Sequence, residues 1–381
     1  MYRLEQGHPG QLPELIAFAE RAFATVGSKP DFARLLPKLY GPDKATESQH
    51  ILLYEDEILE GLCAVQVQDF TVAGQLLRVG WVGTVAVAPE ARGKGHLERL
   101  IIQAGRKMEQ AECDLAVLGG QRQRYRRFGY EYGGSQWEFT LDRRSLCGAK
   151  PGLVQLCSME QDNSHIARAY QMWSKGPIQA PRTLQSFGEV LHSWDAQPNA
   201  VLYEGRFAGY CTLEILPEQV ILRELCLSEE VPLPAFGAAV LEAAKRETFT
   251  AVLPPWPGRT QRWMATEASS ARLAENHSFR VLNWSRVLEV LLTLRAQVET
   301  IPVPGSFCFA VEDGPPLCLQ ADGQSSLRCV PAMPEQEPMR MSEEQAVRLL
   351  LGPMSALEPG YMAVPAGWLP LPMAFSWQDG I

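Results

Sequence analysis

Residues Gly80 to Leu97 carry the strongest structural signal in the chain and read Gly-Trp-Val-Gly-Thr-Val-Ala-Val-Ala-Pro-Glu-Ala-Arg-Gly-Lys-Gly-His-Leu. Its first half is rich in valine and ends at Pro89, which is typical of a β-strand. Its second half begins with a short turn of two basic residues and two glycines, Arg92, Gly93, Lys94 and Gly95. Apolar residues at helical intervals follow the turn. We therefore expect a strand, a glycine turn and a helix in direct succession.

A glycine turn that leads into a helix is suited to binding a pyrophosphate. Glycine lets the backbone approach a ligand closely, and the start of a helix offers unpaired N–H groups. The side chains of Arg92 and Lys94 add positive charge beside them. Such turns occur in many proteins, so the surrounding sequence has to identify the type.

The surrounding sequence resembles the acetyl-CoA loop of the GCN5-related N-acetyltransferases (GNAT). In that family a Val-x-Val strand and a proline precede the pattern Arg/Gln-x-x-Gly-x-Gly/Ala. Arg92 takes the first position of the pattern and Gly95 the fourth, while Leu97 takes the sixth, where a small residue is usual. A bulky sixth residue, followed by Tyr125-Arg126-Arg127-Phe128-Gly129-Tyr130, resembles the enhanced-intracellular-survival (Eis) type.

The resemblance implies a fold class and a domain plan. The resemblance is strong over residues 80–135. In the rest of the chain it rests on the length and the order of the expected domains. It implies an α/β and α+β protein with tandem GNAT-type mixed sheets, flanking helices and a smaller α+β domain similar to sterol carrier protein. We expect a catalytic domain over residues 1–148, a degenerate GNAT-type domain over 149–287 and the sterol-carrier-like domain over 288–381. A length of 381 residues suits two or three domains.

Hydrophobic periodicity predicts the elements of the first unit. Leu12–Phe23 has apolar residues at helical intervals. Strands are expected over 50–56, 59–70, 75–88, 114–118 and 130–141, and helices over 97–111 and 121–128. Strands and helices in this order favour a mixed α/β sheet.

The second unit repeats two features of the first. Leu53-Tyr54-Glu55 precedes Gly61-x-Cys63, and Leu202-Tyr203-Glu204 precedes Gly209-x-Cys211 at an offset near 150 residues. These matches indicate a duplicated domain. The second copy lacks a glycine turn, because Glu229-Glu230-Val231-Pro232-Leu233-Pro234 stands in its place. We therefore expect acetyl-CoA to bind the first copy only.

The last part of the chain is rich in proline and ends in an apolar tail. A helix is expected to start at Ser342. From Leu369 to Trp377 every second residue is apolar, which predicts a strand with one buried face. Because free tails are usually polar, we expect this one to be docked on the protein.

Composition and charge exclude several classes of protein. With 46% hydrophobic and 21% charged residues and no long apolar run, the chain is expected to be a globular, cytoplasmic protein without a membrane span. A net charge of −9 argues against nucleic-acid binding. Nine scattered cysteines argue against a disulfide framework, and neither cysteines nor histidines have metal-ligand spacing, so no metal site is expected.

Charge is spread unevenly along the chain. Nine Lys or Arg and four Asp or Glu lie between Ala91 and Arg127, which suits a polyanionic cofactor. From Arg295 to the end there are four Arg and ten acidic residues. These acids predict either a wall that attracts a cationic amine or an ordinary acidic surface.

The resemblance implies catalytic residues. In the family a tyrosine after the cofactor loop acts as general acid, and the carboxylate at the end of the chain acts as general base. By position these are Tyr125 and Ile381, with Tyr130 and Asp379 as their rivals. Both roles suit amine acetylation, which needs a proton acceptor for the amine and a proton donor for the leaving thiolate.

The resemblance also implies the cofactor contacts. Backbone groups of Val85, Ala86 and Val87 are expected to pair with the pantetheine arm like an added strand. Backbone N–H groups of the loop are expected to hold the pyrophosphate, with the imidazole of His96 not involved. The residues that match are Arg92, Gly93, Lys94, Gly95, His96, Leu97, Gly120 and Gln121.

The function implied is acetyl transfer from acetyl-CoA to a primary amine. The acceptor is left open between an aminoglycoside-like small molecule, a polyamine and a lysine side chain. The family plan also implies a homo-oligomer, often a hexamer. Two alternatives are kept, a catalytically silent acetyl-CoA sensor or scaffold and a lipid-binding protein acting through its last domain.

Overall fold

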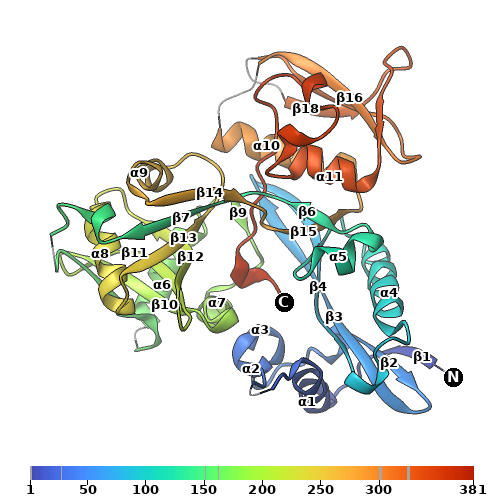
Figure 1. The fold of residues 1–381 in the computed structure, drawn as a ribbon, viewed down its shortest axis with the longest axis horizontal. Coiled ribbons are helices and arrows are strands. Elements are labelled where there is room, and N and C mark those ends of the chain that lie inside the picture. The colour runs from blue at the N-terminus through green and yellow to red at the C-terminus, as the bar shows by residue number, and fades with distance from the viewer. Residues whose placement is uncertain (1, 27, 151, 162, 300–302, 324–326) are drawn as a thin grey trace.

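The structure, a computed structural model, describes residues 2–26, 28–150, 152–161, 163–299, 303–323 and 327–381. Three sheets with flanking helices form three units (Figure 1). The chain ends between the first and second units, at the mark C in Figure 1. The expected class of mixed α/β sheets with flanking helices is confirmed.

The first unit is built on an eight-stranded sheet. Its strands follow the order β1-β2-β3-β4-β5-β15-β6, and β9 (Ile178–Gln179) pairs with β3. The strand bounds are β1 Tyr2–Gln6, β2 His50–Glu55, β3 Ile58–Val72, β4 Gln75–Val87, β5 Leu115–Leu118, β15 His277–Val281 and β6 Glu131–Gly133. The helices are α1 Leu12–Phe23, α2 Phe32–Leu35, α3 Pro37–Tyr40, α4 His96–Gln110 and α5 Arg122–Tyr125.

The second unit is built on a seven-stranded sheet of order β14-β7-β13-β12-β11-β10-β8. The strand bounds are β14 Ser270–Ala274, β7 Gln136–Asp142, β13 Thr248–Leu253, β12 Val220–Leu227, β11 Arg206–Ile215, β10 Gln197–Tyr203 and β8 Val154–Ser158. The helices are α6 Asn163–Trp173, α7 Leu184–Leu191, α8 Leu233–Ala244 and α9 Arg259–Glu267.

The two large sheets have the same order of strand directions. In each, three antiparallel pairings precede one parallel pair, β4 with β5 and β12 with β13, and two further antiparallel pairings follow. A helix, α4 or α8, connects the two parallel strands, as the crossover between parallel strands requires. The shared order agrees with the repeat found in the sequence.

The two sheets exchange one strand each. β7 continues from β6 but lies in the second sheet, and β15 follows β14 but lies in the first. The single strand expected over 130–141 is therefore two strands in different sheets. Gly134 has φ +62 between them, and Ser135 N–H donates to the Met373 carbonyl oxygen instead of a strand partner. The ranges 1–148 and 149–287 consequently do not coincide with the two sheets.

The third unit is a four-stranded sheet with two helices. The order is β18-β17-β16-β19, with bounds β16 Gly305–Val311, β17 Leu317–Ala321, β18 Leu327–Pro331 and β19 Met339–Met341. Its helices are α10 Trp284–Val298 and α11 Glu343–Leu351, the latter capped by Ser342 as expected. The predicted boundary at 287/288 falls inside α10. Cys308 and Cys318 form a disulfide between β16 and β17, a pair that the scattered spacing did not predict.

The C-terminal tail is docked but is not a strand. Pro370 and Pro372 lack the N–H groups that a strand ladder needs. The tail is instead fixed at single points, because Leu371 N–H donates to the Leu350 carbonyl oxygen at 2.8 Å and Phe375 N–H donates to Asn276 Oδ1 at 2.8 Å. Leu371, Met373 and Phe375 are buried. The expected docking is confirmed, and the expected strand is wrong.

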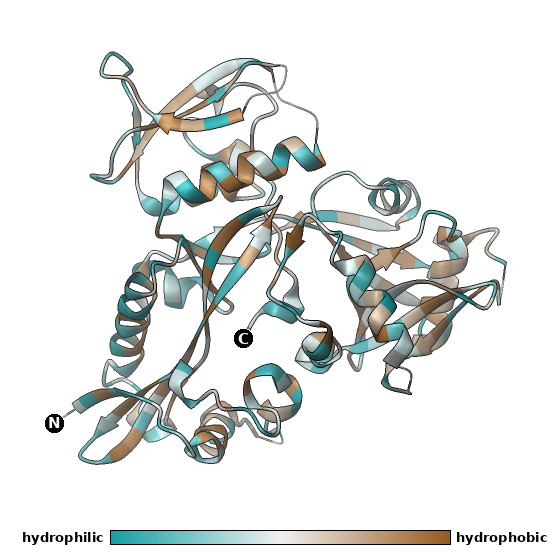
Figure 2. Cartoon of the chain, turned by 180° about the vertical axis from the view of Figure 1, so that it is seen from behind, coloured by the Kyte–Doolittle hydropathy of each residue, from teal (hydrophilic) through white to brown (hydrophobic). Residues whose placement is uncertain are grey.

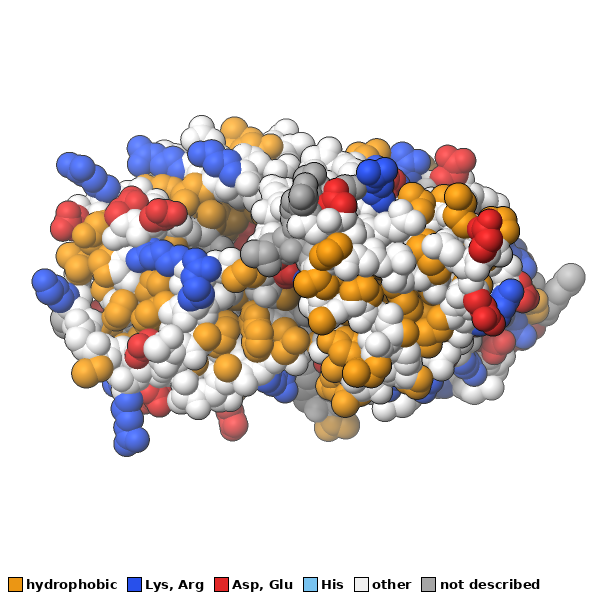
Figure 3. Space-filling model, turned by 90° about the horizontal axis from the view of Figure 1, so that it is seen from above, with side chains coloured by type: hydrophobic (Ala, Val, Ile, Leu, Met, Phe, Trp, Pro, Cys, Tyr) orange, Lys and Arg blue, Asp and Glu red, His pale blue; other side chains and the backbone are white. Residues whose placement is uncertain are grey.

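The surface and core follow the hydropathy of the chain. Figure 2 shows apolar segments along the strands and a largely polar outer side of α4. Figure 3, seen from above, shows hydrophobic side chains scattered among charged ones. In the third unit, Met333, Leu357 and Met362 are exposed. No helix in the described ranges has the length and apolar character needed to cross a bilayer.

Candidate active site

The parallel strands β4 and β5 separate toward their carboxyl ends. They are paired from Val79 with Leu115 to Val82 with Leu118. β4 then continues to Val87, where its pairing is with β3 on the other side. In the described part of the chain, the β5-facing edge of residues 83–87 has no strand partner. The stretch that contains Val85, Ala86 and Val87 is thus open to an extended ligand.

A cavity of about 640 Å³ lies at this opening. It is lined by the carboxyl half of β4, the turn after β5, the loop between α1 and α2, and the chain terminus. Among the predicted site residues it brings together Val85, Gly120, Gln121, Tyr125 and Ile381. The predicted catalytic pair therefore lies in one cavity, although 256 positions separate its members in the sequence (381 − 125).

The predicted pyrophosphate loop has the backbone conformation that glycine permits. Gly93 has φ +84, and Gly95 has φ +79 at the N-cap of α4. The N–H groups of Gly93, Lys94 and Gly95 have no acceptor among the described residues. Together with the first turn of α4, at His96 and Leu97, they form a region of free donors suited to an anion.

Side chains of the loop hold it in place. Lys94 Nζ donates to Glu60 Oε1 at 2.9 Å and to Glu55 Oε2 at 2.8 Å. His96 Nε2 bonds Glu60 Oε2 at 2.6 Å, and Arg92 donates to the Ala22 carbonyl oxygen at 2.9 Å. The imidazole of His96, for which we expected no part in binding the pyrophosphate, belongs to a network that fixes the loop to β3.

The same network resembles a metal site in composition. Ligand-type atoms of Glu55, Glu60 and His96 lie within 4.8 Å of one another. Lys94 Nζ already binds both carboxylates, so a metal ion at this place would have to displace it. The positive charge between these acids comes from the chain itself.

Tyr125 is a buried side chain of α5 that lines the cavity. Its side chain packs against Gly120, where a Cβ would lie 3.1 Å from Tyr125 Cε2 and where φ is +122. Only glycine tolerates this conformation and this contact. Burial raises the pKa of Tyr125, which keeps the phenol protonated as a general acid requires. Tyr130, the rival tyrosine, is fully buried in the core and is not among the described residues that line the cavity.

A buried carboxylate fixes the segment that carries Tyr125. Glu131, at the start of β6, receives hydrogen bonds from Arg122 Nη2 at 2.7 Å and from Arg348 Nη1 at 2.9 Å. Burial alone would raise the pKa of Glu131, but hydrogen bonds from Arg122, Arg348 and the Tyr132 N–H outweigh burial and hold the pKa below its usual range. The cluster ties α5 to α11 of the third unit.

We expect Glu131→Gln to destabilise the protein by about 1–3 kcal/mol, because charged hydrogen bonds to two arginines are lost. A depressed carboxyl pKa contributes stability above the ordinary carboxyl pKa and loses it as pH falls through the depressed value. The difference in melting temperature between wild type and variant should therefore shrink in acid. A difference that stays constant between neutral and acid pH would contradict this role of Glu131.

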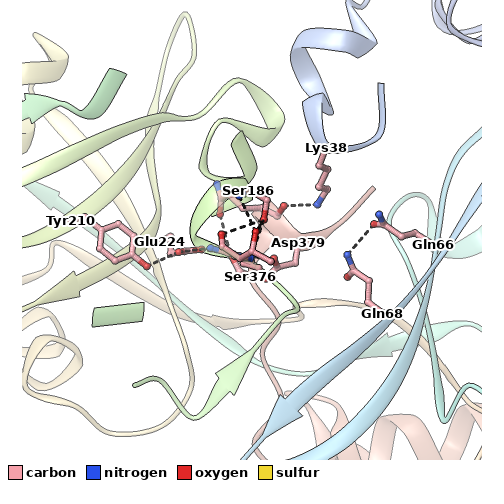
Figure 4. A network of polar contacts seen from close by, with 11 residues as sticks. Lys38, Gln66, Gln68, Ser186, Tyr210, Glu224, Ser376 and Asp379 are labelled. Atoms are coloured by element: carbon pink, nitrogen blue, oxygen red, sulfur yellow. Dashed lines mark hydrogen bonds and ion pairs between the residues drawn. The ribbon is translucent and has the colours of Figure 1, made fainter. Parts of the chain in front are cut away.

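The chain terminus is buried beside β4. Ile381 is 6% exposed, and a Cβ at Gly83 would lie 2.3 Å from its carboxyl carbon, so only glycine leaves room for it. The turn η9 (Trp377–Asp379) precedes it and is held by a polar network (Figure 4). Lys38 Nζ donates to the Gln378 carbonyl oxygen at 2.5 Å.

Asp379 anchors the terminus through a bidentate ion pair. Its Oδ1 and Oδ2 accept from Arg182 at 2.8 and 2.9 Å, and Arg182 also binds both oxygens of Glu224. Ser376 and Tyr210 donate to the same Glu224, as Figure 4 shows. Asp379 lines a different, smaller cavity of about 200 Å³ in the second unit.

Aromatic residues complete the cavity, and sequence reasoning did not assign them to it. They are Phe23, Phe32, Trp81, Trp194, Trp377 and the imidazole of His277. The His277 ring stacks on Trp377 at 5.6 Å, and burial lowers the pKa of His277 to about 4, so the ring is neutral at pH 7. His277 reaches this place only because β15 crosses into the first sheet.

The acidic wall that the sequence suggested does not line the cavity. Among its described lining residues there is no Asp or Glu side chain. The acids of the third unit are used elsewhere, as with Glu358, which accepts from Arg348 at 2.7 Å.

The first unit matches a known protein family. Residues 5–133 match the model of the acetyltransferase (GNAT) domain. These residues are a GNAT acetyltransferase domain. The protein is therefore an acyltransferase that uses acetyl-CoA as its cosubstrate.

Solved structures share the fold over the whole length of the chain. A GCN5-related N-acetyltransferase from Kribbella flavida is 15% identical with a TM-score of 0.67, covering 100% of this chain and 98% of its own. A probable N-acyltransferase from Enterococcus faecalis is 16% identical, with a TM-score of 0.64 and coverage of 90% and 88%. Eis1 from Mycobacterium abscessus is 13% identical, with a TM-score of 0.63 and coverage of 98% and 99%. No curated relative matches the sequence.

Proposed function

We propose that the protein is an N-acetyltransferase of the Eis type that transfers an acetyl group from acetyl-CoA to a primary amine. The observation that carries the proposal is the cavity that Tyr125 and Ile381 share at the opening between β4 and β5. This opening is where the cosubstrate of the GNAT domain would present its thioester. The proposal includes cytoplasmic location and assembly into a homo-oligomer.

In the proposed mechanism the Ile381 carboxylate accepts a proton from the amine. A primary amine has a pKa of about 10 and is mostly protonated at neutral pH, so a base beside it raises the fraction able to attack. The free amine attacks the thioester carbonyl, and a tetrahedral intermediate forms. When it collapses, the carbon–sulfur bond breaks, the Tyr125 hydroxyl protonates the leaving thiolate, and the resulting tyrosinate takes the extra proton from the new amide nitrogen.

Ile381 is the better candidate for the base than Asp379. Both oxygens of Asp379 already accept hydrogen bonds from Arg182. Ile381 lines the cavity with Tyr125, whereas Asp379 lines the smaller cavity in the second unit. Asp379 is then a positioning residue that holds the terminus.

The cofactor contacts are proposed along β4 and the loop. Backbone groups of Val85, Ala86 and Val87 bind the pantetheine arm, since this edge has no strand partner in the described chain. The free N–H groups from Gly93 to Leu97 bind the pyrophosphate. Gly120 and Gln121 lie beside the thioester, and the side chains of Lys94 and Arg92 act by fixing the loop.

The domain plan is proposed as a catalytic unit, a second GNAT-type unit without cofactor and a sterol-carrier-like unit, over 1–148, 149–287 and 288–381. The shared strand order supports the duplication. As with β4 and β5, the parallel strands β12 and β13 of the second unit pair over a short stretch only, at Ile221 and Leu222 of β12. The cavity beyond this pairing is lined by Ser376 and Trp377 of the tail. The segment before α8 there has no glycine.

We expect acetyl-CoA to bind with one site per chain, and Gly95→Leu to weaken that binding roughly tenfold, because the positive φ at Gly95 and the backbone contact are both lost. Titration calorimetry measures both quantities. Gly74→Leu is the matched control, because Gly74 has φ +78 with open space around it and lies at the hairpin between β3 and β4. Two equivalent sites, or equal effects of the two variants, would contradict the assignment.

The experiment that tests the function is a thiol-release assay with acetyl-CoA and a panel of primary amines. Amine-dependent release is the expected result. Binding of acetyl-CoA without transfer to any amine would favour a sensor or scaffold. A lipid-binding role through the third unit is the weaker alternative. Such a role would need an open apolar cavity in that unit, and the docked apolar tail argues against one.

A further inference from the structure

Few charged side chains line the active-site cavity. Its described lining contains no Asp, Glu or Lys side chain, and Arg124 is its one charged side chain. His277 is neutral at pH 7 because burial lowers its pKa to about 4. Among the described lining groups, the Ile381 carboxylate is therefore the anion available to an ammonium group.

Three acids near the cavity are paired with the chain's own cations. Asp379 and Glu224 both bind Arg182, and Asp195 accepts from Arg34 Nε at 2.6 Å and Nη2 at 2.9 Å. A second ammonium group on an acceptor would therefore lose water without gaining any of these three carboxylates. Burying an unpaired charge in this way is unfavourable.

Aromatic rings form the walls of the cavity and come from separate segments. Phe23 at the end of α1 and Phe32 at the start of α2 lie 5.5 Å apart, and Trp194 lies 5.7 Å from Trp377 of the tail. Trp81 of β4 lies at the base, next to His277 at 5.2 Å. Rings of this kind bury apolar surface and stabilise a nearby cation. They suit an apolar body that carries one amine.

We propose that the acceptor is a small primary monoamine carried on an aromatic body, with its amine at the Ile381 carboxylate and its ring between Trp194, Trp377 and the Phe23–Phe32 pair. This inference rests on the proposed function and narrows its substrate class. It disfavours polyamines, aminoglycosides and lysine-bearing peptides, because the first two carry several charges and the last a polar backbone.

The test compares kcat/KM for matched amines in the thiol-release assay. The panel holds 2-phenylethylamine, butylamine, spermidine, kanamycin and a lysine-containing peptide. We expect 2-phenylethylamine to exceed butylamine and spermidine by at least roughly tenfold, since burial of one ring is worth about that much.

Two variants and one control separate recognition from stability. Trp194→Ala should lower kcat/KM for 2-phenylethylamine at least roughly fivefold while changing that for butylamine little, a difference that loss of folding would not produce. Ser28→Asp adds an acid to the lining and should raise the spermidine to 2-phenylethylamine ratio. Trp263→Ala is the control, because Trp263 is half-buried on α9 and is not among the described residues that line the cavity.

The outcomes are distinct. Preference for the aromatic monoamine with a selective loss in Trp194→Ala supports the inference. Preference for a polyamine, an aminoglycoside or the peptide overturns it and leaves the proposed function standing. Transfer to none of the amines, with acetyl-CoA still bound, overturns the proposed function and this inference together.

Discussion

Replacing Tyr125 by phenylalanine is expected to lower turnover by roughly 10²–10⁴, the usual contribution of a general acid. Phenylalanine keeps the ring against Gly120 and removes only the hydroxyl that protonates the thiolate. Steady-state kinetics gives the turnover, and calorimetry should give an unchanged acetyl-CoA affinity. The loss therefore appears in kcat and not in cofactor binding.

Tyr130→Phe is the matched control for this experiment. Tyr130 lies five residues further along, is buried in the core, and is not among the described lining residues. Its variant should keep turnover close to that of wild type. Near-normal turnover in Tyr125→Phe, or an equal loss in both variants, would make Tyr125 a packing residue and remove it from the mechanism.

Extending the chain by a few residues beyond Ile381 is also expected to lower turnover by roughly 10²–10⁴, because the base is moved. In the extended chain Ile381 ends in a peptide bond, and because Ile381 is buried against Gly83 the new terminal carboxylate cannot take the same place. Acetyl-CoA binding should persist, since the loop before α4 is untouched. Thiol release and calorimetry on the same preparation measure both effects.

An N-terminal extension of equal length is the control for the tail. β1 begins at Tyr2, which is half-exposed, and Figure 1 shows this end away from the C-terminus. That protein should keep full activity. A C-terminally extended protein that acetylates amines as fast as wild type would exclude the Ile381 carboxylate and return Asp379 to consideration as the base.

The sequence predicted those parts of the fold that depend on local patterns. Helix Leu12–Phe23 was predicted to the residue, and the strands β2 to β5 and helix α4 lie within two residues of their predicted bounds. The periodicity of these elements is strong, and glycines mark the turn before α4. The loop is therefore the part of the site that sequence reasoning describes best.

The sequence could not predict parts that depend on distant contacts. The exchange of β7 and β15 between sheets leaves no local signal, so residues 130–141 read as one strand and no pattern assigned His277 to the site. The alternation from Leu369 to Trp377 suggested a strand, but Pro370 and Pro372 prevent a ladder there. The aromatic walls come from segments whose meeting only the tertiary structure shows.

The most direct measurement is a crystal structure of the protein with acetyl-CoA. The account predicts one acetyl-CoA per chain, with its pantetheine along residues 85–87 and its thioester in the cavity between the Tyr125 hydroxyl and the Ile381 carboxylate. A ligand in the second unit, or a thioester far from both groups, would contradict it.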